Sequence, residues 1–211
     1  MNPWTDPRRV REYSMGRKDS PADALVLEMI ERLKPGTVME IGTGPGKVFK
    51  AAGSQKGWYP TDLSPVFLEG LDSRLGVCCH AASLPFPERS FHCVLAMAVL
   101  HHLRCDDLQE ALREVYRILV PGGTFILLED WCFARGATPF EEEARKTRFR
   151  HGTRENHLAE GTWVLELELA GLRVTSRTWT TRPFSTGDPR LLQWSEDERV
   201  VRMLCFQALK P

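Results

Sequence analysis

The sequence has little that would tie it to a membrane, to nucleic acid or to secretion. It contains no apolar run of about 18 residues, the length that a transmembrane helix needs. It has no excess of either charge, because 28 Lys and Arg balance 28 Asp and Glu, and this argues against broad capture of nucleic acid or anionic membrane. The polar N-terminus has no apolar signal-peptide core, so we expect a cytoplasmic protein.

The cysteines lack the spacing of a metal site. An even count of six would allow three disulfides, but there is no Cys-x-x-Cys pair and no Cys/His spacing typical of zinc. Most of the cysteines lie in or beside apolar runs of a chain that is not short, so we expect buried reduced thiols and no metal site. They are Cys78, Cys79, Cys93, Cys105, Cys132 and Cys205.

Strand-length apolar runs alternate with helix-length amphipathic segments, which is typical of an α/β fold with a parallel sheet and crossover helices. The predicted strands are 37–41, 57–61, 75–79, 91–97, 124–129, 172–181 and 200–209. The clearest predicted helices are 21–33, 106–119 and 158–170. The length favours one domain, residues 1–211, with an N-terminal cap segment (1–20) and an insertion at 131–156, which we call the lid.

A glycine-rich turn follows the first predicted strand, where Gly42, Gly44 and Gly46 alternate with other residues. Glycines let the backbone approach a ligand closely, and the start of the next helix offers free N–H groups, although an ordinary strand-to-helix turn can look the same. Asp62 closes the second predicted strand, where an acid can accept both hydroxyls of a ribose. Two further segments, 81–92 and 100–124, follow in order.

In this order and spacing, the segments resemble the class I S-adenosylmethionine-dependent methyltransferases, particularly the small-molecule branch related to ubiquinone and menaquinone biosynthesis enzymes. The resemblance runs from about residue 37 to residue 130 and more loosely to the C-terminus. It implies a Rossmann-like, seven-stranded, mostly parallel sheet with helices on both faces and an antiparallel last strand. It also implies S-adenosyl-L-methionine as cofactor, S-adenosyl-L-homocysteine as product, and an O, N, C or S atom of a small molecule as methyl acceptor.

The resemblance also implies a cofactor site, carried over position by position. Glu40 and the glycine turn would face the methionine part of the cofactor, and Asp62 would hold the ribose. The implied contacts are Glu40, Gly42, Thr43, Gly44, Gly46, Asp62, Leu63, His80, Ala81, Ala82, Met97, Ala98, His102 and Tyr13. His80 departs from the family pattern, because it stands where relatives carry an acid that binds the adenine amino group.

Two adjacent histidines, His101 and His102, follow the fourth predicted strand, where the resemblance places the substrate. Some natural-product O-methyltransferases with a similar Leu-His-His segment are thought to use a histidine there as base, oriented by an acid at the end of the fifth strand. We therefore predict His101 as the base and Asp130 as the acid, with Glu129 as the alternative acid. A purely structural histidine at the start of a helix is the competing interpretation.

The lid carries the candidate substrate contacts. Its basic side chains could bind an anionic substrate such as a carboxylate or phosphate, and tryptophans, Trp163 among them, could flank an aromatic one. The candidates are Trp131, Arg148, Arg150 and His151. The alternative is a solvated helix face that is stabilised by the pairs Glu141–Arg145 and Glu142–Lys146.

Two other function classes stay open. The departure at His80 and the structural interpretation of the two histidines are compatible with a partner subunit that binds the cofactor but is inactive. A nicotinamide-dependent oxidoreductase fits less well, because the glycine spacing is Gly-x-Gly-x-Gly. Members of the resembled family that act on nucleic acid usually carry an Asn/Asp-Pro-Pro-Tyr-type motif after the fourth strand. This sequence lacks that motif, which disfavours a nucleic-acid substrate. We expect a small-molecule substrate, no nucleic-acid or membrane partner, and a monomer or homodimer.

Overall fold

The computed structural model describes residues 6–15, 19–52, 57–71, 75–130, 137–150, 155–184 and 188–211. The strands are β1 (Val38–Ile41), β2 (Trp58–Asp62), β3 (Val77–Cys78), β4 (Phe91–Met97), β5 (Leu119–Asp130), β6 (Arg173–Pro183) and β7 (Val200–Leu209). The helices are α1 (Pro7–Met15), α2 (Pro21–Leu33), α3 (Lys47–Ala51), α4 (Pro65–Glu69), η2 (Leu100–His102, a 3₁₀ turn), α5 (Cys105–Ile118), α6 (Pro139–Arg150) and α7 (Glu160–Leu169).

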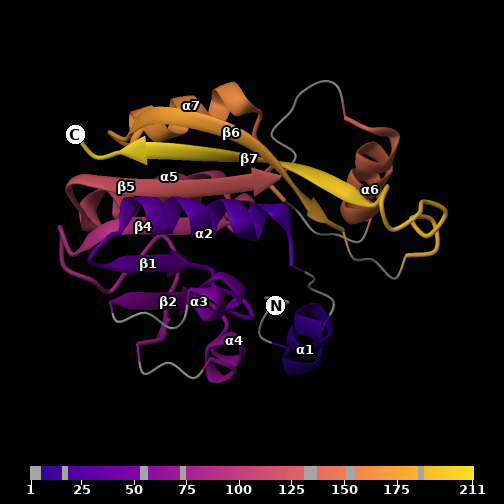
Figure 1. Ribbon diagram of the computed structural model, residues 1–211, viewed down its shortest axis with the longest axis horizontal. Helices are drawn as coiled ribbons and strands as arrows, with labels where there is room; N and C mark the ends of the chain where they lie inside the picture. Colours follow the sequence, from indigo (N-terminus) through magenta and orange to yellow (C-terminus); the bar gives the residue numbers. More distant parts are fainter. Residues whose placement is uncertain are drawn as a thin grey trace.

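The strands form one sheet in the order β3-β2-β1-β4-β5-β7-β6 (Figure 1). Pairing is parallel from β3 to β5, whereas β7 is antiparallel to both β5 and β6. The expected Rossmann-like, seven-stranded fold with an antiparallel last strand is therefore confirmed. Among the described residues, no helix is long and apolar enough to cross a membrane.

Helices cover both faces of the sheet because the central strands are apolar on both sides. In β4, Cys93, Leu95 and Met97 pack in one core with α2 and α3. Val94 and Ala96, which alternate with them, pack in a second core with α5 and α7. This alternation is what a parallel strand between two helix layers requires. Trp163, expected beside a pocket, is instead fully buried in the second core.

The fifth strand differs most from its prediction. It begins at Leu119 rather than Thr124, and it includes the Pro-Gly-Gly segment that lies between the predicted helix 106–119 and the predicted strand 124–129. The cause is pairing outside the local sequence: Gly122 N donates to Lys210 O (2.8 Å), and Lys210 N donates to Gly123 O (3.0 Å). The chain end after β7 therefore extends the ladder along this segment.

Smaller differences affect the second and third strands. Pro60 lies inside β2. The carbonyl of Asp62 accepts from Cys79 N on the β3 side, and the backbone groups of Pro60, two residues earlier, face the same side. Pairing with β3 begins only at Thr61, so the missing N–H of Pro60 breaks no ladder bond. β3 itself spans two residues rather than five.

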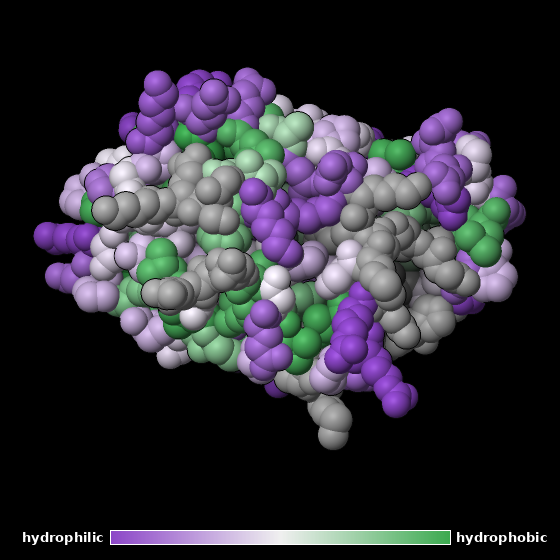
Figure 2. Space-filling model, turned by 60° about the horizontal axis from the view of Figure 1, so that its bottom comes forward, coloured by the Kyte–Doolittle hydropathy of each residue, from purple (hydrophilic) through white to green (hydrophobic). Residues whose placement is uncertain are grey.

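The described part of the lid contains α6, which packs against the end of β6 and the start of β7 (Figure 1). Glu141 is buried and binds the guanidinium of Arg202 (Oε2–Nη2 2.7 Å), and Lys146 pairs with Glu143 (3.6 Å). The expected pairs Glu141–Arg145 and Glu142–Lys146 are therefore replaced, because α6 turns Glu141 toward the sheet. Figure 2 shows hydrophobic residues scattered among hydrophilic ones on the face that it presents.

The five described cysteines are free thiols, and Cys132 lies outside the described residues. Cys93 and Cys205 are buried, and burial raises the pKa of each to about 12. Cys78 and Cys105 are exposed, so the expectation of buried thiols holds for only part of the set.

Candidate functional site

The carboxyl ends of β1, β2, β4 and β5 meet at one edge of the sheet, and the glycine turn lies there. Gly42, Gly44 and Gly46 all have positive φ (65°, 53° and 71°), a conformation that glycine adopts without strain. A Cβ built on Gly42 would lie 2.3 Å from Val99 Cγ2, so the turn is packed directly against the segment after β4. Thr43 N donates to Thr61 O (2.9 Å), which joins the turn to β2.

Asp62 joins this turn to the segment after β2, because each of its carboxylate oxygens accepts from one of them. Oδ2 accepts from Gly44 N (2.9 Å) and Oδ1 from Ser64 N (2.8 Å). Burial raises the pKa of Asp62, and these backbone hydrogen bonds offset part of that rise. Each carboxylate oxygen keeps a second lone pair that can accept a hydroxyl. Leu63, the next residue, is 43% exposed and presents an apolar side chain beside the acid.

Glu40 lies in β1, two residues before the glycine turn, and is buried. Its Oε2 accepts from the indole Nε1 of Trp58 (3.2 Å), which comes from the neighbouring strand. Trp58 is itself buried, and this hydrogen bond orients the carboxylate of Glu40. Tyr13, the predicted contact from the N-terminal segment, packs edge-on against Phe67 of α4.

The loop after β3 holds His80, Ala81 and Ala82. Ser83 N donates to His80 O (2.9 Å), and Ala82 N donates to Nδ1 of the His80 ring (3.2 Å). When this ring is neutral, its proton must therefore be on Nε2, which makes Nε2 a donor. It cannot then accept from an adenine amino group as an acid would, although it can donate to a ring nitrogen.

The chain leaves β4 through a strained residue. Ala98 has φ of 52°, which is uncommon for a residue with a Cβ, and its N–H donates to Leu128 O (2.8 Å). Such outliers are concentrated at functional sites. Met97, immediately before it, is largely buried at the end of β4.

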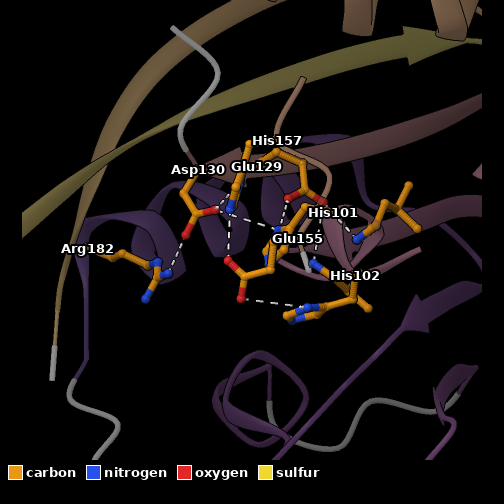
Figure 3. Close-up of polar contacts among 9 residues, drawn as sticks. His101, His102, Glu129, Asp130, Glu155, His157 and Arg182 are labelled. Carbon is orange, nitrogen blue, oxygen red and sulfur yellow. Dashed lines mark hydrogen bonds and ion pairs between the residues drawn. The ribbon is translucent and has the colours of Figure 1, made fainter. Parts of the chain in front are cut away.

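His101 lies in η2 and is 2% exposed. Its Nδ1 is 2.5 Å from Oε2 of Glu129, whereas Oδ1 of Asp130 is 3.6 Å away, beyond hydrogen-bond distance (Figure 3). The other oxygen of Glu129 accepts from Leu100 N (2.8 Å) and Val99 N (3.3 Å). Glu129 therefore both fixes the turn and orients the imidazole.

Asp130, the acid that we predicted for this role, forms its direct ion pair with Arg182 of β6 instead (Figure 3). Burial lowers the pKa of His101, but the charges of Glu129 and Asp130 and the hydrogen bond to Glu129 outweigh it, so the pKa is raised. Burial likewise lowers the pKa of Arg182, and Asp130 reverses the shift. The site therefore favours the charged imidazolium and guanidinium.

Three contributors to this site were missed at the sequence level: Arg182, and Glu155 and His157, which follow α6. His157 stacks on the ring of His101 (centroids 4.9 Å apart), and its Nδ1 is 3.6 Å from Asp130 Oδ1. Its Nε2 is 2.8 Å from Glu155 Oε2, and Glu155 Oε1 is 3.9 Å from Nδ1 of His102. We see no motif that marks these residues. The sequence shows only that an acid, Glu155, and a histidine, His157, lie two residues apart where the lid ends.

Two overlapping groups of these residues bring potential metal-ligating atoms within 4.8 Å of one another: His101, Asp130 and His157, and His101, His102 and Glu155. However, Asp130 binds a guanidinium, and Nδ1 of His101 is already hydrogen-bonded to Glu129, which belongs to neither group. The contacts fit a hydrogen-bonded acid–base group better than a metal centre.

The predicted substrate contacts lie at the limits of the described chain. Trp131 and His151 fall outside the described residues. Arg148 and Arg150 belong to the last turns of α6, and only their backbone is described.

Comparisons with known proteins agree with this geometry. Residues 39–127 match a family described as "Methyltransferase domain". The ubiquinone/menaquinone biosynthesis C-methyltransferase UbiE of Hahella chejuensis is 38% identical over 68 residues, which cover 32% of this chain and 25% of that protein. The same enzyme of Enterobacter sp. is 40% identical over 53 residues, or 25% and 20% of the two chains. The match thus spans a quarter or less of these curated relatives.

Solved structures show a wider likeness in fold. The 1,6-didemethyltoxoflavin-N1-methyltransferase of Burkholderia thailandensis, with bound 1,6-didemethyltoxoflavin and S-adenosylhomocysteine, is 20% identical (TM-score 0.63, covering 90% of this chain and 76% of that one). The N-methyltransferase NodS of Bradyrhizobium japonicum, with S-adenosylhomocysteine, is 16% identical (TM-score 0.60, 92% and 90%). The cyclase SpnF is 19% identical (TM-score 0.61, 90% and 81%).

The sheet order, the glycine turn and the acid that ends β2 define a Rossmann-like methyltransferase fold. The match over residues 39–127 agrees with the resemblance of these segments to the class I S-adenosylmethionine-dependent methyltransferases. The presence of a cyclase among the similar folds shows that the fold by itself does not fix the reaction.

Proposed function

We propose that this protein transfers the methyl group of S-adenosylmethionine to a small-molecule acceptor whose proton is taken by His101. The buried hydrogen bond between His101 and Glu129 carries the proposal. It lies at the ends of β4 and β5, and Val99 links it to the cofactor turn, because Val99 packs on Gly42 and donates to Glu129. A base held by an acid beside the cofactor turn is what proton removal during methyl transfer needs.

Methyl transfer is an in-line displacement, in which the acceptor–carbon bond forms as the carbon–sulfur bond breaks and neutral S-adenosylhomocysteine leaves. The glycine turn and Asp62 would fix the cofactor, together with the other contacts implied by the family resemblance. Much of the rate would come from this alignment. The proton of the acceptor would pass to Nε2 of His101, while Nδ1 stays bonded to Glu129. Glu129 replaces Asp130 as the orienting acid of our proposal.

The similar proteins indicate which acceptors to try first. The name of one relative gives a C-methyltransferase, and those of two structural neighbours give N-methyltransferases, so carbon and nitrogen acceptors deserve the first trials. The basic residues Arg148, Arg150 and His151 and the aromatic Trp131 remain our candidates for contacts with an anionic or aromatic substrate.

Cofactor binding is tested by isothermal titration with S-adenosylhomocysteine. We expect Asp62→Ala to weaken binding at least tenfold, because it removes the proposed ribose acceptor and the hydrogen bond that holds Gly44 of the turn. Asp197→Ala, a change at an exposed acid outside the site, should stay within twofold of the wild type. Equal affinity in both variants would remove the ribose assignment.

The role of the base is tested with a panel of acceptors, by following release of S-adenosylhomocysteine. On an acceptor that is turned over, His101→Gln should slow the chemical step by roughly 10²–10⁴-fold, and His92→Gln, at an exposed histidine bonded to Thr37, should not. Because the pKa of His101 is raised, the wild-type rate should rise with pH through a value above 6.5. Full activity of His101→Gln at saturating acceptor would leave this histidine a structural role.

A further inference from the structure

One long strand at the edge of the sheet has an open outer side. β6 ends the strand order, and no strand pairs with its outer side within the described part of the chain (Figure 1). Five consecutive residues, 175–179, are exposed, and because side chains alternate between the two faces, both faces are open there. Trp179 is 47% exposed. An open strand edge is a template for pairing with another chain.

The pairing with β7 shows which backbone groups of β6 point outward. Phe184 N, just after β6, donates to Arg199 O (2.8 Å). In an antiparallel ladder, residues that bond to the partner strand alternate with residues whose N–H and C=O groups face away from it. Arg202 N agrees with this count, because it lies opposite Thr181 and donates to Glu141 instead of to β6 (2.9 Å). The outward residues are therefore Arg177, Trp179 and Thr181.

This free edge is interrupted at both ends, at equal distances from Trp179. Pro183, the next outward residue, has no N–H to donate. At Thr175 the register between β6 and β7 shifts, which marks a β-bulge that disturbs the ladder. The bulge is as many residues before Trp179 as Pro183 is after it. The open part of the edge is thus symmetric about Trp179.

We propose that two copies of this protein pair through their β6 edges, antiparallel, about a two-fold axis at Trp179. In this register the two copies of Trp179 lie opposite each other, and Arg177 lies opposite Thr181 of the partner subunit. All outward N–H and C=O groups between the two interruptions then meet groups that also face outward. The two sheets become one continuous sheet. The proposal concerns a surface of the fold and is independent of the methyl-transfer reaction.

The side chains that this register brings together are compatible. The other face of the strand pairs Thr178 with Thr180 of the partner subunit, and aromatic and threonine pairs both stabilise antiparallel strands. Like charges do not lie opposite each other, because Arg177 meets a threonine. A two-fold axis at Arg177 would instead set two guanidinium groups face to face. Any shift of the register also sets an outward residue against the bulge or against Pro183. Charge and symmetry therefore favour a second copy of this chain as the occupant.

The oligomeric state of the full chain tests the proposal. Sedimentation equilibrium should give twice the mass of one chain. Trp179→Lys should weaken the dimer at least tenfold, because it removes the aromatic pair and sets two charges opposite each other at the axis. Leu169→Lys, at a leucine of α7 that is 71% exposed, is the matched control and should leave the dissociation constant within twofold. Circular dichroism verifies the fold of each variant.

Thr181 tests the register, because two substitutions there should act in opposite directions. Thr181→Glu sets a carboxylate opposite Arg177 of the partner subunit and should tighten the dimer about threefold. Thr181→Lys sets a like charge there and should weaken the dimer about threefold. Each contact occurs twice in the dimer, which makes these modest changes measurable.

Three results would overturn the proposal. The first is a wild-type protein that stays monomeric up to millimolar concentration. The second is a dimer that Leu169→Lys weakens as much as Trp179→Lys does, since the interface then lies elsewhere. The third is a dimer that responds alike to Thr181→Glu and Thr181→Lys, since Arg177 then does not face Thr181. Opposite responses of these two variants, with a strong effect only at Trp179, support the two-fold pairing.

Discussion

The cofactor turn and the acid–base cluster lie at the same sheet edge, but they are held by different forces. The turn at Gly42–Gly46 is positioned by the backbone, with positive-φ glycines and N–H groups that donate to Asp62 and Thr61. The cluster around His101 is held largely by ionisable side chains, from η2, β5, β6 and the segment after α6. We therefore expect the glycines of the turn to be sensitive to added side-chain volume, and the cluster to be sensitive to the loss of a charge.

The largest effect is expected where one charge of the cluster is removed. Arg182→Met leaves Asp130 buried without its guanidinium, so we expect a loss of about 4 kcal/mol in the free energy of unfolding, as for other broken buried pairs. The matched control on the same strand is Arg177→Met. Its pair with Glu160 is largely exposed, so the loss should stay below about 1 kcal/mol. Urea unfolding measures both, and similar losses would show that burial does not strengthen the Arg182 pair.

The cofactor turn should be broken by shape instead. Gly42→Ala adds a Cβ that must displace Val99 and adopt positive φ, so we expect a loss of about 3 kcal/mol in stability and weaker cofactor binding. Gly44→Ala has the same backbone strain but meets nothing within 4 Å, so about 1–2 kcal/mol is expected. The difference between the two variants isolates the contact with Val99. Equal losses would mean that this close approach carries no energy.

The same contrast explains which elements could be predicted from the sequence. The strands 91–97 and 200–209 and the helix 21–33 have the predicted bounds, because apolar runs and the Ser20 cap are local signals. The start of β5 could not be predicted, since Leu119 pairs with Phe91 of β4 and the Pro-Gly-Gly segment pairs with Lys210, about 90 residues away. Trp163 was misplaced for a similar reason: a single indole does not show whether it faces a core or a pocket.

The candidate site divides in the same way. The glycine turn and Asp62 carry a motif because their spacing along the chain sets their geometry. Glu129 and Asp130 are adjacent, and only the packing of η2 decides which of them meets His101. Arg182 and His157 come from segments whose approach to His101 depends on the docking of β6 and of the chain after α6. The spacing of residues along the chain does not predict such a contact, so it can be seen only in the folded structure.

The smallest predicted effect on stability concerns the packing of α6 on β7. An ion pair between Glu141 of α6 and Arg202 of β7 joins these two elements. Burial alone would raise the pKa of Glu141, but hydrogen bonds from Arg202 and from Thr138 N lower it below its ordinary value of 4.5. A depressed pKa means that the stabilisation is present above pH 4.5 and is lost as the pH falls through the lower folded value.

Glu141→Gln should therefore cost about 1.5 kcal/mol near pH 7, as expected when hydrogen bonds to a charged group are weakened. The difference from the wild type should shrink as the pH falls below 4.5, because the wild-type carboxylate is then protonated as well. Glu142→Gln, at the exposed neighbour, should change neither the stability nor its pH dependence. Urea unfolding followed by tryptophan fluorescence reports on this region, because Trp194 packs against Phe140 of α6. A deficit that persists undiminished in acid would show that Glu141 acts through packing, and α6 would then resemble the cofactor turn rather than the cluster.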